Sequence, residues 1–467
     1  MPSNVAFYIS GVVKPDSSQV GAIKQIVTEF GGTAAWTKLN AGLQRGLARI
    51  SPSFTKNVLP QVGQRVGFAF TKFVPSEFQS ANGGMPADAA VVIPSSNPSK
   101  LQQAIKQTHS SGGGVTAVDG GDLLVGGPAA VNAIKSNHGP TLTGNSAYKS
   151  LAAPEALGSG FVNMHEFISG MQSSPQAGQA FQSPALQAEL KKLPNDAAAG
   201  MSLTATGKAI TLDFAPYHVP SASASAAKAS TVAGLPSSSI LALALNISQK
   251  SLQTMSKNAL NNLSSGLSQS SAMTGGGLAA ATQKLTQISK TILPALGPLQ
   301  LSIGGSSFLK PQVGLSMTPY NQKAADNLLG LLRKQITSSA GANVHVTPAK
   351  GGFALSAPPS YNATVTHTGN QILGLMGFQN ANAFLHSGSP LSSDSTYKTA
   401  TSQLPGGSKV PVFLNFGNLK KLVTQLFQLQ GKSNDPSTIK TEAILGHLNY
   451  LILGLSGSSD RLVLGLN

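Results

Sequence analysis

Residues 58–70 read VLPQVGQRVGFAF, a Pro-x-apolar-Gly turn that leads directly into an alternating strand. The same signal returns at residues 292–303, which read ILPALGPLQLSI. Each turn also follows an earlier apolar strand at the same distance, because Pro60 comes 53 positions after Phe7 and Pro294 comes 53 positions after Leu241. A signal repeated at a fixed offset indicates internal duplication. We therefore expect two tandem copies of one α+β unit, each with a mainly antiparallel sheet covered by helices.

Further pairs of short runs occur in the same order in both halves of the chain. They are SAYK at 146–149 with STYK at 395–398, FVNM at 161–164 with FLNF at 413–416, and the closing hairpins at 201–214 and 450–466. Between the halves, residues 216–239 are rich in Ser, Ala and Pro, which is typical of a linker. The sequence predicts a first repeat at 1–215, a linker at 216–239 and a second repeat at 240–467.

Local signals place the elements inside each repeat. Apolar residues at helical spacing predict a helix from Val20 that stops at Gly31-Gly32, and Pro128 is expected at the first position of another helix. The run 119–122, DGGD, between two short apolar strands predicts a hairpin. In the second repeat, helices are expected at 252–267 and 278–292.

Charged residues are scarce in this chain. They make up 10% of it, against about 25% in an average soluble protein. The net charge of +16 arises from 32 Lys and Arg against 16 Asp and Glu, so the chain is poor in acids. Its lysines are spread singly, whereas nucleic-acid binders usually cluster them on one face. We expect no specific binding of nucleic acid, and keep a binder of anionic polymers as an alternative function.

The composition also bears on the compartment. The chain has no cysteine, which excludes disulfides, thiol catalysis and thiolate metal sites. Neutral polar residues replace the missing charges, so stability should vary little as pH falls. No apolar run reaches the roughly 18 residues that span a bilayer. We expect an extracytoplasmic protein, secreted or held at the outer face of a membrane only through a signal or anchor that precedes Met1.

The opening run NVAFYI at 4–9, the stretch 58–70 and the run LTGNSAYK at 142–149 resemble the bacterial domain-of-unknown-function family 3352. The resemblance covers the first repeat well and the second more faintly. It implies an uncharacterised extracytoplasmic or membrane-anchored protein, and it assigns no active site. Asn163 and Asn415 stand where the resemblance leads us to expect an acidic residue.

The sharpest catalytic candidate is the Ser-x-x-Lys pattern, present as Ser146 with Lys149 and as Ser395 with Lys398. Residues three apart share a helix face, and a desolvated lysine there would deprotonate the hydroxyl for nucleophilic attack. Penicillin-recognising acyl enzymes use this pair together with Ser-Asp-Asn and Lys-Thr-Gly. Neither tripeptide occurs, and KTE at 440–442 comes nearest.

A structural interpretation explains both occurrences of the pattern. In it the serine is the N-cap of a helix, Tyr148 and Tyr397 pack inward, and the lysines stay exposed. Other candidates have similar explanations. His165 is expected to be a surface or partly buried histidine rather than part of a metal or acid/base pair with Glu166. Asp119 and Asp122 are expected to be turn residues rather than calcium ligands, and Gly126-Gly127 a strand-to-helix junction rather than an anion site.

The function expected from these patterns is non-enzymatic. We expect a binding or scaffold protein of the bacterial envelope or exterior, with no catalytic residue, no cofactor and no metal. Its partners are unknown, and envelope or extracellular proteins or further copies of the chain are candidates. The main alternative is an envelope serine hydrolase that uses Ser146 with Lys149 or Ser395 with Lys398.

Overall fold

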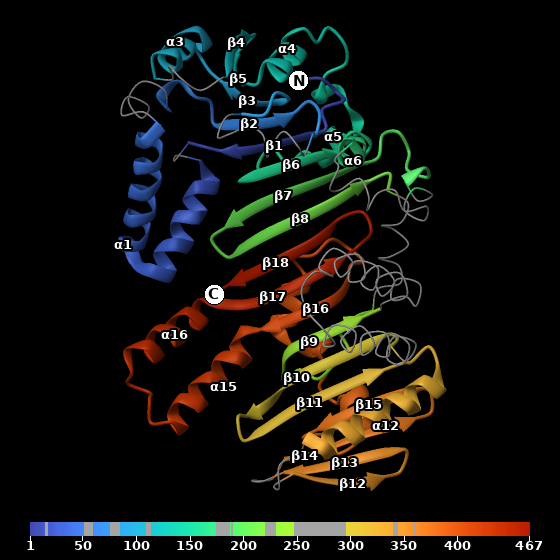
Figure 1. The fold of residues 1–467 in the computed structure, drawn as a ribbon. Helices are drawn as coiled ribbons and strands as arrows, with labels where there is room; N and C mark the ends of the chain where they lie inside the picture. Colours follow the sequence, from blue (N-terminus) through green and yellow to red (C-terminus); the bar gives the residue numbers. More distant parts are fainter. Residues whose placement is uncertain are drawn as a thin grey trace, which may run out of the picture. The chain divides into compact units, whose positions relative to one another are not determined.

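The computed structural model describes residues 1–14, 17–50, 59–74, 85–108, 114–173, 187, 190–219, 230–246, 296–339, 344–357 and 361–467. The chain divides into two compact units, Met1–Ala227 with Ser456–Asn467, and Lys228–Leu455. Both combine helices with antiparallel strands, as Figure 1 shows. The predicted α+β class and the mainly antiparallel pairing are therefore confirmed.

The first unit is built on one antiparallel sheet in the order β4-β5-β3-β2-β1-β6-β7-β8-β18. The central strand β1 pairs with β2 on one side and β6 on the other, and Figure 1 shows β6, β7 and β8 following side by side. The strands are β1 Phe7–Val12, β2 Arg65–Phe70, β3 Ala89–Pro94, β4 Val115–Asp119, β5 Asp122–Gly126, β6 Gly158–Asn163, β7 Ala198–Thr206, β8 Ala209–Tyr217 and β18 Asp460–Leu466.

Two of the predicted local signals are found in the helices of this unit. In α1 the residue Gly32 has φ 70° and ψ 175°, which interrupts the helix at the predicted Gly-Gly pair. Pro128 is the first residue of α4. The helices are α1 Ser18–Ile50, α3 Pro98–Thr108, α4 Pro128–Lys135, α5 Ser146–Leu151 and α6 Met164–Ser173, with 3₁₀ turns η2 Leu59–Gln61 and η3 Leu142–Gly144.

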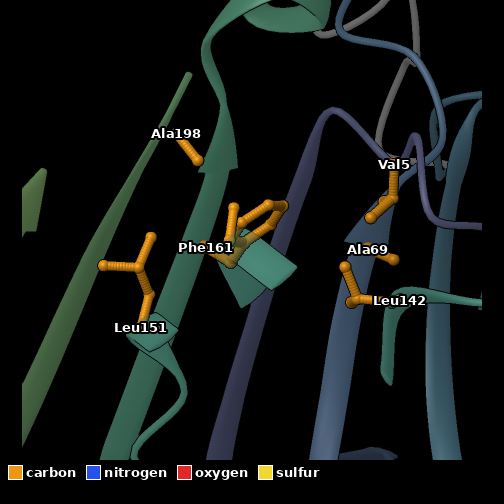
Figure 2. Close-up of a cluster of buried hydrophobic side chains, with 7 residues drawn as sticks. Val5, Ala69, Leu142, Leu151, Phe161 and Ala198 are labelled. Atoms are coloured by element: carbon orange, nitrogen blue, oxygen red, sulfur yellow. The ribbon is translucent and has the colours of Figure 1, made fainter. Parts of the chain in front are cut away.

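A core cluster lies where α5 and η3 cover β1, β2, β6 and β7. Phe161 of β6 stands at its centre with 2% of its surface exposed. Figure 2 shows this ring between Leu151 and Ala198 on one side and Ala69 and Leu142 on the other. Burial of such apolar side chains is the main favourable term in folding. The motif SAYK thus begins a helix that covers the sheet.

The second unit also has one antiparallel sheet, in the order β12-β13-β14-β15-β11-β10-β9-β16-β17. Its central strand β9 pairs with β10 and β16. The strands are β9 Ser239–Leu245, β10 Leu299–Ser307, β11 Lys310–Met317, β12 His345–Ala349, β13 Gly352–Ala357, β14 Tyr361–Thr368, β15 Gln371–Met376, β16 Lys409–Asn415 and β17 Leu448–Leu455.

Helices and 3₁₀ turns accompany this sheet. They are α12 Gln322–Ser339, α13 Ala381–Leu385, η4 Leu391–Ser393, α14 Ser395–Thr401, α15 Phe416–Leu429 and α16 Pro436–His447. The helices predicted at 252–267 and 278–292, and residues 292–295 of the repeated turn, lie outside the described residues, as does Val58. In the described part of the chain no helix is long and apolar enough to cross a membrane.

Candidate functional site

The first Ser-x-x-Lys pair lies on the surface of α5. Asn145 is the N-cap, and its side chain accepts a hydrogen bond of 3.1 Å from the backbone nitrogen of Tyr148. Ser146 is therefore the first residue of the helix, and the prediction that it is the N-cap is wrong. Ser146 and Lys149 are both exposed, and no hydrogen bond between them occurs within the described residues.

The second pair has the same placement on α14. Asp394 caps this helix by accepting a hydrogen bond of 2.8 Å from the backbone nitrogen of Tyr397. Ser395 and Lys398 are exposed. A lysine that activates a hydroxyl needs apolar surroundings or a neighbouring cation, and the exposed position of Lys398 supplies no apolar surroundings. In both units, the serine and the lysine stand in solvent.

The tyrosine between them points into the core. The rings of Tyr148 and Phe161 meet edge to face with centroids 5.6 Å apart, and those of Tyr397 and Phe413 do so at 5.1 Å. Burial raises the pKa of both phenols. Edge-to-face pairs contribute to stability beyond their buried area. Each SAYK-type motif therefore contributes an aromatic core residue.

The remaining candidates from the sequence occupy structural positions. His165 Nε2 lies 2.9 Å from the carbonyl oxygen of Pro194. Asp119 and Asp122 face each other across the predicted hairpin, and burial raises the pKa of Asp122. Gly127 is the N-cap of α4. Among the described residues, no group of three or more His, Cys, Asp or Glu is placed to hold a metal.

Asn163 and Asn415 share one role. The Oδ1 of Asn163 accepts hydrogen bonds from the backbone nitrogens of His165 and Glu166 at the start of α6, at 3.1 and 3.3 Å. Asn415 caps α15 by accepting a bond of 3.0 Å from the nitrogen of Asn418. Asparagine is among the best N-cap residues, so an acidic residue is not needed at either position.

A groove in the second unit is the binding-site candidate, and no sequence motif predicts it. Two adjoining hollows of about 390 and 470 Å³ share Ser306, Gln312, Gly377 and Phe378 in their walls. These volumes fall in the range of ligand pockets, roughly 300–1,000 Å³. The other lining residues are Pro236, Ser237, Ser238, Leu309, Lys310, Pro311, Asn362, Met376, Gln379, Ala383, Ser387 and Ser389.

A β-bulge places Ser306 in the groove wall. In the β10–β11 ladder, Gly305 pairs with Pro311 and Ser307 pairs with Lys310, which leaves Ser306 as the extra residue. Gly305 has φ 136°, a conformation that favours glycine. Bulges often redirect a side chain beside a functional site. Ser306 thereby lines both hollows.

Gly377 positions the aromatic ring of the next residue, Phe378. Gly377 has φ 73°, and a Cβ atom there would lie 2.1 Å from the carbonyl oxygen of Pro311. The next residue, Phe378, packs against the fully buried ring of Phe384, with centroids 5.4 Å apart. The close approach at Gly377 and the support from Phe384 hold Phe378 at the groove wall.

The groove is polar but almost uncharged. Ser238 donates a hydrogen bond of 2.9 Å to Oε1 of Gln312, which orients the amide. Within the described part of the chain, neither the Gln312 amide nitrogen nor the Ser306 hydroxyl has a protein partner. Lys310 is the single titratable residue among those that line the two hollows. Hydroxyls and amides of this kind bind by hydrogen bonds and do not supply acid–base catalysis.

No family model, curated protein or solved structure matches this chain.

Proposed function

We propose that this chain is a non-enzymatic binding or scaffold protein of the bacterial envelope or cell exterior, and that the groove around Phe378 is its binding surface. The observation that carries the proposal is the groove itself, where hydroxyls, amides and one supported aromatic ring converge. A concave site with a few placed polar groups is the usual form of a binding pocket.

We infer that the two halves of the chain descend from one duplicated module. The strand order β4-β5-β3-β2-β1-β6-β7 in the first unit parallels β14-β15-β11-β10-β9-β16-β17 in the second, with β12 and β13 added at the edge. The paired roles of Tyr148 with Tyr397 and of Asn163 with Asn415 support the same inference. We propose that the two copies occupy residues 1–215 and 240–467, so β18 belongs to the second copy although it pairs with β8 in the first unit.

The extracytoplasmic placement rests on composition and on the resemblance to domain-of-unknown-function family 3352. The absence of cysteine and the 10% charged residues support it. Protease treatment of intact bacterial cells that produce the protein from its own gene tests it. Digestion without cell lysis is the expected result, and full protection until lysis would contradict the proposed compartment.

A screen for hydrolysis tests the non-enzymatic part of the proposal. Purified protein should not turn over aryl esters or peptidoglycan fragments, because Ser146 and Ser395 lie in solvent beside exposed lysines. Turnover by the native chain that is lost in Ser146→Ala or Ser395→Ala would establish the serine hydrolase instead. Ser150→Ala, a change at an exposed serine of the same helix, is the matched control.

A further inference from the structure

We propose that the groove of the second unit binds an uncharged oligosaccharide, with Phe378 stacking on a sugar ring and Gln312 and Ser306 hydrogen-bonding to its hydroxyls. This inference rests on the proposed binding function and names the class of ligand. It is carried by the geometry of the lining residues: their polarity, their lack of acidic groups and the support beneath the aromatic ring.

The polar groups of the groove match those of a sugar. Each sugar hydroxyl both donates and accepts, and so do serine hydroxyls and carboxamides. Because Ser238 donates to Oε1 of Gln312, the amide nitrogen of Gln312 is a donor without a protein partner among the described residues. The bulged Ser306 adds a hydroxyl to both hollows. Together they offer a donor and a donor–acceptor among the residues that line both hollows.

The aromatic ring supplies the apolar contact that a sugar ring needs. A pyranose presents C–H groups on its faces, and these pack against the negative face of an aromatic ring. Phe378 is half-buried and rests against Phe384, which has no exposed surface. Gly314 leaves room for the Phe384 ring, since a Cβ there would lie 2.4 Å from Cδ2. These contacts hold the Phe378 ring in place before a ligand binds.

The same walls disfavour other ligand classes. A polyanion requires several cations, and Lys310 is the one charged residue among those lining the hollows. A cationic peptide requires carboxylates, which the lining residues lack. An extended peptide that adds a strand requires an open sheet edge. The strands beside the groove, β10, β11 and β15, each pair with a neighbour on both sides.

Titration calorimetry of the full chain with neutral oligosaccharides tests the inference. The probes are maltohexaose, cellohexaose and chitohexaose, together with a printed array of neutral glycans. Phe378→Leu keeps apolar volume against Phe384 but removes the ring face, and we expect it to weaken binding about tenfold, equivalent to about 1.4 kcal/mol. Gln312→Glu keeps the acceptor for Ser238 but loses the amide donor, so it should weaken binding to a similar extent.

Phe308→Ala is the matched control. Phe308 is an exposed phenylalanine at the end of the same β10–β11 hairpin, with 41% of its surface accessible, and it lines neither hollow. This variant should bind as the native chain does. Thermal unfolding of each variant checks that the second unit stays folded. Phe378→Tyr, which retains the ring, should keep native binding.

The outcomes separate this inference from the proposed function. Binding of a neutral glycan that is lost in Phe378→Leu and kept in Phe308→Ala supports both. No binding to any neutral glycan, or equal binding by these two variants, overturns the glycan inference. If heparin or polyglutamate binds instead and Phe378→Leu abolishes that binding, the glycan inference fails and the groove remains the binding surface. Hydrolytic turnover lost in Ser146→Ala would overturn the proposed function itself.

Discussion

Arg461 stands directly opposite Asp213 in the antiparallel pair of β18 and β8, with its Nε 2.6 Å from Asp213 Oδ1. Its Nη2 lies 3.3 Å from Oδ2, so the guanidinium engages both carboxylate oxygens. The two side chains are only 32% and 20% exposed. Paired charges held in this two-pronged geometry and shielded from water interact more strongly than exposed pairs. The ion pair therefore helps to fix the last strand of the chain to β8.

Removing one partner of this pair should destabilise the first unit. Asp213→Ala leaves the partly buried guanidinium of Arg461 without this carboxylate, and we expect a loss of about 1–2 kcal/mol in the free energy of unfolding. Urea unfolding followed by circular dichroism measures it. The exposed pair His218–Asp196 provides the control, since its side chains are 55% and 47% accessible. Asp196→Ala should cost less than about 1 kcal/mol; equal losses in both variants would contradict the prediction.

The tyrosine of the STYK motif, rather than its serine, should determine stability. Tyr397 is 5% exposed and packs on Phe413, so Tyr397→Ala should cost about 3–4 kcal/mol of unfolding free energy. Ser395→Ala and Lys398→Met change exposed side chains and should each stay within about 0.5 kcal/mol of the native chain. Chemical denaturation of the three variants measures their free energies of unfolding and checks that Tyr397→Ala loses the most. A cost for Ser395→Ala as large as that of Tyr397→Ala would show that the hydroxyl has a role beyond the surface.

Local chemistry explains the parts of the fold that the sequence predicts. Gly32, Pro128 and the Asp119–Asp122 hairpin each act within a few residues of their own position, so their effect is readable along the chain. Sequence patterns alone do not predict β14, β15 or α16. In the strand β14, Thr364, Thr366 and Thr368 alternate with Val365 and His367, and the pairing of this strand with β13 and β15 is a tertiary property.

The groove is likewise not predicted by the sequence, because it depends on tertiary contacts. Ser238, the β10–β11 hairpin that holds Ser306 and Gln312, and Phe378 come from separate parts of the sequence, and none belongs to a motif with known chemistry. The bulge at Ser306 depends on the pairing register of β10 and β11, which the sequence does not reveal directly. By contrast, the exposed Ser-x-x-Lys pairs form a recognisable pattern whose side chains do not come together as a catalytic site. In this chain the most recognisable sequence pattern therefore does not mark the groove that is the binding-site candidate.

Stability should change little on acidification. Burial raises the pKa of Asp122, so protonation of that carboxyl favours the folded state and adds stability as pH falls. Hydrogen bonds from Ser437 lower the pKa of Asp435, so its contribution is present above the unfolded pKa and is lost as pH falls. These effects oppose each other, and the chain has only 16 acidic residues. We expect the free energy of unfolding to change by no more than about 2 kcal/mol from about pH 7 to about pH 3.

Urea unfolding at a series of pH values measures this dependence. In Asp122→Asn the gain from protonating a partly buried carboxyl is absent, so the variant should lose more stability on acidification than the native chain. A steep loss in the native protein would contradict the acid-tolerant character expected from its composition.

Alkaline pH should act through Tyr8. Burial raises the pKa of Tyr8 from 10.0 to about 12, and Tyr148, whose ring centroid is 6.0 Å away, adds to this effect. The unfolded chain loses its phenol proton first, so the stabilisation is complete below the unfolded pKa of 10.0 and is lost as pH rises toward about 12. We expect native stability to fall by about 2 kcal/mol more than that of Tyr8→Phe over this interval. Parallel urea unfolding of both proteins measures the difference, and equal slopes would show that the phenol of Tyr8 ionises as it does in water.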